Sequence, residues 1–600
     1  MPTVPTTRPL QSTRTLLLGI WSHLSHRRRI QLCLLLIVML ASGVAELLSL
    51  GAALPFLAVL NEPLQLWQQP LIQHLASRVR IASASQLVMP VTLIFATASL
   101  LAALVRLANL WLNARLAAAV GSDLSCEAYR RTLYQPYTVH IQRNSAAVIT
   151  ATTTQIELTV VALRTLLQLI TSVVVGVGLL AGLFVIDSAV AFGALALFGT
   201  AYVLLAAKAR GQLRSNGLKI AEASSHRLKA LNEGLGAIRD VLLNGSQSIH
   251  LQIYREADRP QRQLQAENYF FGAFPRYVLE ALAMVAIAIL GGLLVLQRGT
   301  GLSVIPLLGT LALGFQRLLP ALQQIYSGWA QLKGYNAAIQ DVLAMLNQPL
   351  PLEVFGVKAL PLREGIRLDS VSFSYEPHKT NVLQGLDLEI LPGERIGLIG
   401  SSGSGKSTTL DLLMGLLLPS NGRVMVDGLD LHDLEHPERL AAWRTSIAHV
   451  PQSVYLADRS IAENIAFGVP RRQIDLGLVK QAAAQAQIAS FIEESSQGYE
   501  SHVGERGIRL SGGQRQRIGI ARAIYKQARV LIFDEATSAL DHETEESVMN
   551  AINGLSRELT VILVAHRLTT VERCDRVIRL SQGLKVADGP PQQVLANSYH

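Results

Sequence analysis

Six apolar segments in the N-terminal part of the chain restrict its fold more than any other feature. Each is long and apolar enough to cross about 30 Å of bilayer hydrocarbon as a helix. Charged residues make up 16% of the chain, whereas roughly 25% is usual in soluble domains. The chain is therefore predicted to begin with an α-helical membrane domain of six transmembrane helices. The segments lie near Ile30–Leu57, Leu87–Leu112, Val160–Ile186, Ala189–Ala207, Tyr277–Leu296 and Leu302–Ile325.

The connections between these segments predict which side of the membrane they face. Two long connections, about Asn113–Thr159 and Lys208–Arg276, are rich in basic residues. The connections between the third and fourth segments and between the fifth and sixth are only a few residues long. Basic loops tend to stay on the cytoplasmic side of a membrane. Both termini are therefore expected in the cytoplasm. The net charge of +9 is attributed to these loops and not to a nucleic-acid partner.

The two long connections have helical periodicity and few turn signals, which predicts that they extend the membrane helices into the cytoplasm. Pro136 and the pair Asn244-Gly245 interrupt this pattern. They predict hairpin tips within Tyr134–Asn144 and Asp240–Ile253 that touch the C-terminal domain. The segment Asn61–Gln86 fits a short amphipathic helix in the outer interface, and an ordinary loop is the alternative.

Composition shifts predict four parts of the chain. They are a cytoplasmic tail at 1–29, the membrane domain at 30–345, a proline-rich linker at 346–363 and a nucleotide-binding domain at 364–600. The three cysteines, Cys33, Cys126 and Cys574, are far apart and lack metal-ligand spacing. We therefore expect them to be ordinary reduced residues.

A glycine-rich loop in the C-terminal domain has the pattern of a phosphate-binding loop. An apolar strand, Arg395–Ile399, leads into the loop, and a helix is predicted to begin at Lys406. In this context backbone N–H groups face the phosphates, Lys406 reaches the β- and γ-phosphates, and the Ser407 hydroxyl binds Mg²⁺. The predicted ATP-binding residues of the loop are Gly400, Ser401, Ser402, Gly403, Ser404, Gly405, Lys406, Ser407 and Thr408.

A second motif supplies carboxylates. Val530–Phe533 is a continuous apolar run, as expected of a strand buried on both faces. Asp534, at its end, is predicted to be a Mg²⁺ partner. Glu535 follows directly and is predicted to accept a proton from an attacking water. Together with the phosphate loop, these residues predict an α/β P-loop NTPase domain that hydrolyses ATP.

These motifs identify a family. The chain resembles ATP-binding cassette (ABC) exporters that carry one membrane half and one ATPase half per chain, and Leu510–Gln514 resembles their signature motif. The resemblance implies that Ser511, Gly512, Gly513 and Gln514 bind the γ-phosphate of a nucleotide held by a second copy of the chain. It therefore implies the ABC exporter fold and a homodimer enclosing two ATP molecules.

Four further positions match the family pattern. By resemblance, Tyr375 stacks on adenine and Gln452 contacts Mg²⁺ and the attacking water. Asp541 bridges the two subunits, and His566 contacts the γ-phosphate. The resemblance thus implies the catalytic set Lys406, Gln452, Glu535 and His566, and the metal set Ser407, Gln452 and Asp534.

Arginines in the membrane segments are the candidates for cargo binding. A cation in a membrane helix is costly and usually faces a cavity or a partner. Arg106 and Arg317 lie within predicted spans, and Arg276 lies at the start of one. One interpretation is an internal ion pair with Glu46 or Glu280, or snorkelling to the interface. The other is a basic cavity for an anionic head group.

A narrower resemblance favours the second interpretation. The stretches Phe274–Glu280 and Gln316–Pro320 resemble bacterial lipid-linked oligosaccharide flippases. The resemblance implies that Arg106, Arg276 and Arg317 contact a lipid-linked pyrophosphate at the inner (cytoplasmic) membrane. We therefore expect an ATP-driven flippase that moves a lipid-linked oligosaccharide, or a similar anionic glycolipid, to the outer leaflet. The alternatives are a general lipid or multidrug exporter and an ATP-gated channel or membrane scaffold.

Overall fold

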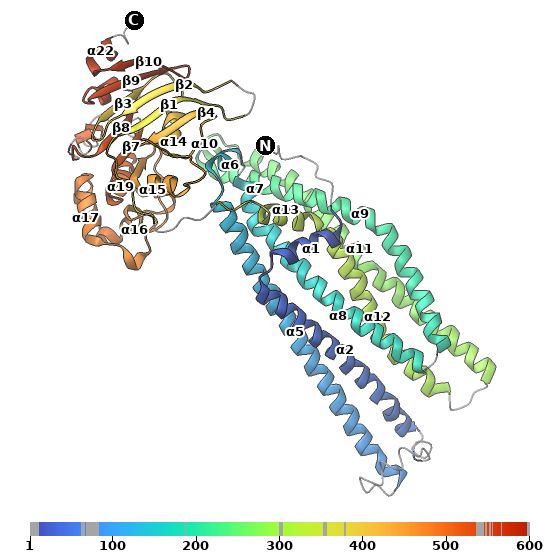
Figure 1. Ribbon diagram of the computed structural model, residues 1–600. Coiled ribbons are helices and arrows are strands. Elements are labelled where there is room, and N and C mark those ends of the chain that lie inside the picture. The colour runs from blue at the N-terminus through green and yellow to red at the C-terminus, as the bar shows by residue number, and fades with distance from the viewer. Residues whose placement is uncertain are drawn as a thin grey trace. The chain divides into compact units, whose positions relative to one another are not determined.

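Six long helices form most of the N-terminal unit in the computed structural model of the chain, and each contains all or nearly all of one predicted span (Figure 1). The six predicted segments are therefore helical over their described residues. Among the described residues, three helical stretches are long and apolar enough to cross a membrane, namely His26–Ala53, Val88–Leu133 and Val148–Gly182. The six helices are α2 (His26–Asn61), α5 (Val88–Leu133), α8 (Ile156–Ile186), α9 (Ser188–Gly236), α11 (Gln247–Arg298) and α12 (Val304–Gly334).

The chain divides into two compact units, each considered by itself below. One comprises Met1–Gln135 with Arg143–Leu350, and the other Pro136–Gln142 with Pro351–His600. The predicted interfacial helix in Asn61–Gln86 and part of the predicted linker lie outside the described residues. The structure describes residues 11–61, 67, 83–143, 145–186, 188–298, 304–351, 357–376, 380–535, 545–546, 549–550, 552, 554, 556–565 and 567–596.

Within the membrane unit, α5, α9 and α11 continue far beyond the predicted spans, as the helical periodicity of the long connections predicted. Both predicted hairpin tips are short helices. They are α10 (Ile238–Leu243), in this unit, and α6 (Tyr137–Gln142), which belongs to the unit with Pro351–His600. The turn after α10 uses Gly245 at φ 60°, a backbone conformation that glycine adopts without strain. The long helices pack in pairs, α2 with α5, α9 with α11, and α8 with α12.

The first helix, α1 (Thr13–His23), lies in the segment that the sequence predicted as a tail. The Ser12 hydroxyl caps its N-terminus by accepting a hydrogen bond from the Thr15 N–H at 3.1 Å. Its buried residues Leu16 and Ile20, one turn apart, join a core that includes Leu343 of α13 (Asn336–Leu346). The other short elements of this unit are the 3₁₀ turn η1 (Ala84–Leu87), α7 (Ser145–Thr150) and the π-helical turn η2 (Ala151–Gln155).

The C-terminal unit contains two sheets (Figure 1). The six-stranded sheet has the order β10-β9-β3-β8-β7-β6, and its five strands from β9 to β6 run parallel. The antiparallel four-stranded sheet has the order β2-β1-β4-β5. The strands are β1 (Ile366–Phe373), β2 (Leu383–Ile390), β3 (Arg395–Ile399), β4 (Asn421–Val426), β5 (Leu429–Asp430), β6 (Ile447–Val450), β7 (Val530–Asp534), β8 (Thr560–Val564), β9 (Arg576–Ser581) and β10 (Leu584–Gly589).

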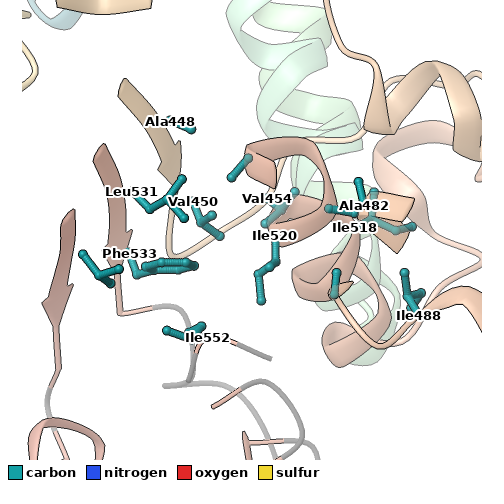
Figure 2. Packing of buried hydrophobic residues seen from close by; sticks show 14 of the residues in the cluster. Ala448, Val450, Val454, Ala482, Ile488, Ile518, Ile520, Leu531, Phe533 and Ile552 are labelled. Atoms are coloured by element: carbon teal, nitrogen blue, oxygen red, sulfur yellow. The ribbon is translucent and has the colours of Figure 1, made fainter. Parts of the chain in front are cut away.

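Helices cover the six-stranded sheet, and one of them, α19 (Gly512–Tyr525), begins at the predicted signature motif. Figure 2 shows Ile518 and Ile520 of α19 in the same core as Val450 of β6 and Phe533 of β7. The other helices described within 357–596 are α14 (Lys406–Leu413), α15 (Glu438–Ser446), α16 (Ile461–Ile465), η3 (Arg471–Gln473), α17 (Leu476–Gln485), α18 (Ala489–Glu494), η4 (Gly498–Glu500), η5 (Glu505–Gly507), α21 (Leu568–Val571) and α22 (Pro591–Ala596).

A close approach of α9 to α12 yields a test of the membrane unit. A Cβ added to Gly217 would lie 2.7 Å from the Gly334 carbonyl oxygen, which cannot rotate away. We predict that Gly217→Ala lowers the free energy of unfolding by about 1–3 kcal/mol, the usual effect of overpacking. The thermal unfolding midpoint of the purified chain in detergent measures this effect.

Gly211, on the same helix, is the matched control. A Cβ added there meets no heavy atom within 4 Å. Gly211→Ala should therefore raise the stability slightly, because alanine favours a helix over glycine by about 0.5–1 kcal/mol. Equal unfolding midpoints for the two variants would contradict the close approach.

Candidate nucleotide-binding site

The phosphate loop connects the buried strand β3 to α14. Gly400, Gly403 and Gly405 have φ values of 155°, 77° and 101°, which favour glycine. A Cβ on Gly400 would lie 2.3 Å from the Leu580 carbonyl oxygen. Gly405 is the N-cap of α14 and makes no side-chain cap. The first-turn N–H groups of α14 therefore remain suited to an anion, as at other phosphate-binding helix N-termini.

Lys406 is held inside this loop. Its side chain is buried, and Nζ donates hydrogen bonds to the carbonyl oxygens of Gly400 at 2.8 Å and Ser401 at 3.0 Å. These carbonyls compensate part of the cost of burying the ammonium group. Ser407, the next residue, is exposed at the first turn of α14. Lys406, predicted to bind phosphate, and Ser407, predicted to bind Mg²⁺, thus lie side by side at the start of one helix.

Tyr375 lies against the same helix. Its hydroxyl is 3.1 Å from the Thr408 hydroxyl, and its ring meets Phe373 edge to face at 5.0 Å between centroids. The structure therefore brings the predicted adenine-stacking residue to the phosphate loop. The bond to Thr408 was not foreseen, because nothing in the spacing of these residues indicates it.

Gln452 and Glu535 also meet. They come from the segments that follow β6 and β7, and Gln452 Nε2 donates a hydrogen bond to Glu535 Oε2 at 2.9 Å. Glu535 has φ 48°, a left-handed conformation that costs energy for a residue other than glycine and is common at functional sites. Its N–H donates to the Val564 carbonyl of β8 at 3.0 Å. The backbone therefore fixes this carboxylate next to Asp534.

Asp411, on α14, is a titratable group that the sequence analysis did not single out. Burial, together with the nearby negative charge of Asp534, raises the pKa of Asp411 from 3.8 to about 6. The only indication in the sequence was an acidic residue between two leucines, Leu410 and Leu412. A concentration of carboxylate oxygens beside a serine hydroxyl suits a hard divalent cation.

The predicted metal ligands therefore fit Mg²⁺. Asp534 ends β7, Ser407 begins α14, and Gln452 reaches the same edge through Glu535. Mg²⁺ is commonly bound by one or two protein oxygens together with phosphate oxygens and water. Among the described residues, no group of three or more His, Cys, Asp or Glu side chains is placed to hold a metal.

The signature motif forms the N-terminus of α19. Ser511 Oγ accepts a hydrogen bond from the Gln514 N–H at 3.2 Å, and Gln514 Oε1 accepts one from the Ser511 N–H at 2.8 Å. This capping box explains both residue types structurally. Gly512 is exposed, with no heavy atom within 4 Å of an added Cβ. Among the described residues, no hydrogen bond or ion pair joins the signature motif to the phosphate loop.

Two predicted residues, Asp541 and His566, lie outside the described residues. The neighbour of His566 is described. Arg567 forms an ion pair with the buried Glu545, which also accepts a hydrogen bond from the Thr570 hydroxyl at 3.3 Å. The roles predicted for Asp541 and His566 remain predictions.

The three membrane arginines are in different situations. Arg106 forms an ion pair with Glu46 at 3.1 Å, with 51% of the arginine side chain and 7% of the glutamate side chain exposed. The Arg106–Glu46 ion pair considered from the sequence is thus present. Arg276 is exposed and lines a cavity of the membrane unit, whereas Arg106 is not among the residues that line it. The side chain of Arg317 lies outside the described residues.

Comparisons with known proteins agree with this geometry. Residues 383–538 match the family model described as ABC transporter. The structure is also similar to a solved structure described as a bacterial Atm1-family ABC exporter with ATP bound. The TM-score is 0.76, with 23% sequence identity over 95% of this chain and 96% of that chain. The C-terminal unit is therefore an ABC transporter ATPase domain, and the chain as a whole has the ABC exporter fold.

Curated relatives extend the comparison. The chain is 35% identical over 396 residues to the ATP-dependent lipid A-core flippase of Chromobacterium violaceum, and 40% identical over 264 residues to that of Chromohalobacter salexigens. It is also 42% identical over 271 residues to the leukotoxin translocation ATP-binding protein of Mannheimia glucosida. The alignments cover 65%, 44% and 45% of this chain, and 65%, 44% and 37% of the respective relatives. The chain thus matches less than two thirds of the length of each.

The raised pKa of Asp411 predicts a pH-dependent stability. Because this pKa is higher in the folded protein than in the unfolded chain, the folded state binds more protons between about pH 4 and pH 6. The contribution of Asp411 to stability therefore falls as the pH rises through this range. Asp411→Asn removes the titration. Relative to the wild type, the unfolding midpoint of the variant should increase from pH 4 to pH 6. The difference between the two midpoints should stay constant above pH 6.

Thermal unfolding of the ATPase domain in the full chain, measured at half-unit pH intervals, checks this prediction. Asp433→Asn is the control, because Asp433 is paired with Arg439 at 2.9 Å and lies outside the site. A difference between Asp411→Asn and wild type that does not change with pH would contradict the burial of the charge.

Proposed function

We propose that the chain is an ATP-driven exporter that moves an anionic glycolipid from the cytoplasmic to the outer leaflet of a bacterial inner membrane. The observation that carries the ATPase part is the meeting of Gln452 with Glu535 beside Asp534. These groups stand in an ABC transporter domain that shares its chain with a unit of six long helices. Such a pairing suits the coupling of ATP hydrolysis to movement across a bilayer.

The chain's residues have distinct tasks in ATP hydrolysis. The N–H groups of the phosphate loop and Lys406 Nζ bind the β- and γ-phosphates. Ser407, Asp534 and Gln452 would hold Mg²⁺, which supplies charge neutralisation at these phosphates. Glu535 accepts the proton of the attacking water, and the Gln452 amide keeps its carboxylate oriented.

A second copy of the chain completes the site. The α19 N-terminus, with the exposed Gly512 and Ser511, faces a partner and not the phosphate loop of its own chain. Two supports are the absence of a described bond between these motifs within one chain and the exporter fold. Asp541 and His566 are assigned to the same shared interface. The functional unit is therefore a homodimer with two nucleotides.

The hairpin tip α6 provides the link to the membrane helices. Although it continues from α5, it belongs to the compact unit that contains the ATPase domain. Gln142 Nε2 donates to the Tyr375 carbonyl at 3.4 Å, and burial beside Asp411 and Tyr375 raises the pKa of Tyr137. A displacement of Tyr375 on nucleotide binding would therefore be transmitted to α6 through this contact. ATP shifts the conformation only by binding one state more tightly than the other.

The cargo assignment rests on the membrane unit. The shorter alignments do not discriminate, because they show 40% identity to a relative named for a lipid A-core and 42% to one named for a leukotoxin. The 396-residue alignment to the Chromobacterium violaceum flippase is longer than Pro351–His600 and so extends into the membrane unit. A lipid-linked oligosaccharide and a lipid A-core are both anionic glycolipids. Arg276 on the cavity wall suits their phosphates.

Glu535→Gln tests the catalytic assignment. Loss of a general base commonly costs about 10²–10⁴-fold in rate, so ATP hydrolysis should fall by about 100-fold or more while ATP binding persists. Phosphate release and nucleotide binding are measured on the same purified protein. Glu435→Gln, at an exposed position away from the site, is the control. Hydrolysis within about 3-fold of wild type would reject Glu535 as the base.

Reconstitution tests the cargo assignment. A fluorescent polyprenyl-pyrophosphate oligosaccharide is placed in one leaflet of proteoliposomes, and its ATP-dependent arrival in the other leaflet is followed, with Glu535→Gln as the blank. We expect movement by the wild type only. Movement of unrelated hydrophobic compounds but not of this glycolipid would favour a general lipid or drug exporter.

The same assay tests the arginines. Replacing Arg106, Arg276 and Arg317 by alanine should lower the number of glycolipids moved per ATP hydrolysed at least about 10-fold, because charge-assisted bonds to phosphate are lost. A triple variant of the exposed arginines Arg210, Arg255 and Arg259 is the control. Equal ratios for the two triple variants would reject the assignment and leave Arg106 as a structural partner of Glu46.

A further inference from the structure

Three peptide bonds connect the two compact units. The chain passes between the units at Gln135–Pro136, at Gln142–Arg143 and at Leu350–Pro351. The first two bonds flank α6, and the third leads from the segment after α13 toward the strands of the ATPase domain. The way in which the membrane unit holds its own ends of these bonds therefore determines how a displacement of the ATPase domain reaches the long helices.

Arg131, in the last turn of α5, and Gln135, just after this helix, bind the segment that follows α13. Arg131 Nη1 donates a hydrogen bond to the Gln348 carbonyl oxygen at 2.8 Å, and Gln135 Nε2 donates one to the Pro349 carbonyl oxygen at 3.0 Å. Gln135 Nε2 also donates to the Arg131 carbonyl oxygen at 2.8 Å. The chain before the first connection is thus tied to the chain before the third.

Arg143 adds the remaining connection. In the orientation of the Gln348 side-chain amide that satisfies both of its polar atoms, Oε1 accepts hydrogen bonds from Arg143 Nη1 at 3.1 Å and Nη2 at 3.2 Å. A guanidinium is a rigid planar donor, so two of its N–H groups on one oxygen restrict the direction of the contact. Gln348 is buried, with its backbone bound by Arg131 and its side chain by Arg143. All three connections therefore meet at this residue.

The Arg131 guanidinium is itself held in place. Its Nε donates a hydrogen bond to Glu127 Oε1, one turn earlier on α5, at 2.6 Å, and 21% of the Arg131 side chain is exposed. A guanidinium makes both contacts with separate nitrogen atoms, whereas a lysine side chain has only one nitrogen. Glu127 therefore orients Arg131 so that Nη1 faces the Gln348 carbonyl.

An apolar core and α1 fix the surroundings of these bonds. Leu124 and Ala128 of α5, one turn apart, share a core with Leu346, the last residue of α13. The next residue, Asn347, has its Oδ1 at 2.8 Å from Nε2 of His23, the last residue of α1. The ends of α1, α5 and α13 therefore form one packed cluster next to the three connections.

We propose that Arg131, Gln135 and Arg143 are positioning residues that unite the three connections into one joint. Their bonds to Gln348 and Pro349 define this joint. A displacement of the ATPase domain then reaches the ends of α5, α7 and α13 together, because the two ends of α6 and the start of the linker are bound at one place. This role rests on the proposed function in one respect, namely that ATP binding changes the conformation of the membrane unit.

Amide hydrogen exchange without nucleotide tests whether the joint is one cooperative element. The full chain is studied in lipid nanodiscs, and exchange is followed in the segments 132–135 and 345–350. Arg143→Ala should raise the exchange rate about 10-fold in 345–350, as expected when a charge-assisted hydrogen bond is lost. It should raise the rate by a similar factor in 132–135, which belongs to another connection.

Arg262→Ala is the control for this measurement. Arg262 pairs with Asp258 at 2.6 Å within α11, and loss of an exposed pair should leave exchange in both segments within about 2-fold of the wild type. Faster exchange in 345–350 alone after Arg143→Ala would show that the connections move independently. That result would overturn the joint.

Distance measurements between spin labels test whether the joint carries movement. Met89, at the predicted outer end of α5, is 78% exposed and is labelled as Met89→Cys in a chain without its native cysteines. In the Glu535→Gln background, ATP should change the distance between the labels of two copies. The triple variant Arg131→Ala/Gln135→Ala/Arg143→Ala should reduce this shift in equilibrium about 10-fold or more. With Glu535 intact, it should hydrolyse ATP within about 3-fold of the wild type, because these side chains lie outside the ATP site.

Two further variants separate positioning from charge and from a general loss of stability. Gln252→Ala/Arg259→Ala/Arg262→Ala removes the same residue types from exposed positions of α11 and should behave like the wild type. Arg131→Lys keeps the charge but cannot hold both of its partners, so it should also reduce the ATP-dependent distance change. A wild-type response of Arg131→Lys would overturn the positioning role of Arg131.

A wild-type distance response in the triple alanine variant of the joint would overturn the joint as the carrier of movement. Failure of the proposed function gives a different result. If the wild type itself shows no ATP-dependent distance change, the exporter is rejected together with the transmitting role. The hydrogen-exchange measurement, which needs no ATP, still decides whether the three connections form one joint.

Discussion

The parallel pairing of β3, β8 and β7 is the constraint on which the ATP site depends. Val564 of β8 pairs with Leu398 of β3 on one side and with Asp534 of β7 on the other. This register places the carboxyl ends of β3 and β7 at the same level of the sheet. The phosphate loop follows the carboxyl end of β3, and Asp534-Glu535 stand at the carboxyl end of β7. A shift of one residue would turn the side chains of β7 to the opposite face and separate the two motifs.

Several residues near this edge of the sheet are in energetically unfavourable states. Glu535 has a left-handed backbone conformation, Lys406 is a buried cation, and Asp411 is a partly buried carboxyl with a raised pKa. Costs of this kind persist only where the surrounding structure fixes them. Here the fully buried strands β3 and β8, together with the core between β6, β7 and α19, supply that rigidity. These three unfavourable features therefore lie at the proposed ATP site.

The sequence predicted those features that rest on local patterns. Apolar length predicted the six long helices, and motif spacing predicted that Lys406, Asp534 and Glu535 belong to one site. Features that depend on tertiary contacts were missed. The helix α1 is stabilised by contact with α13, more than 300 residues away in the chain. Arg131, Arg143 and Gln348 stand in three separate segments, and only packing brings them to one joint.

The proposed mechanism depends on the signature motif of one chain completing the phosphate loop of another. The test variant is the full chain with its native cysteines replaced and with Ser402→Cys, Gly512→Cys and Glu535→Gln introduced. Disulfide formation between the two new cysteines is the direct measurement. Both positions are exposed. The account predicts a covalent dimer that forms with ATP and Mg²⁺ and not without nucleotide. A disulfide within single chains, or no dimer with ATP, would contradict it.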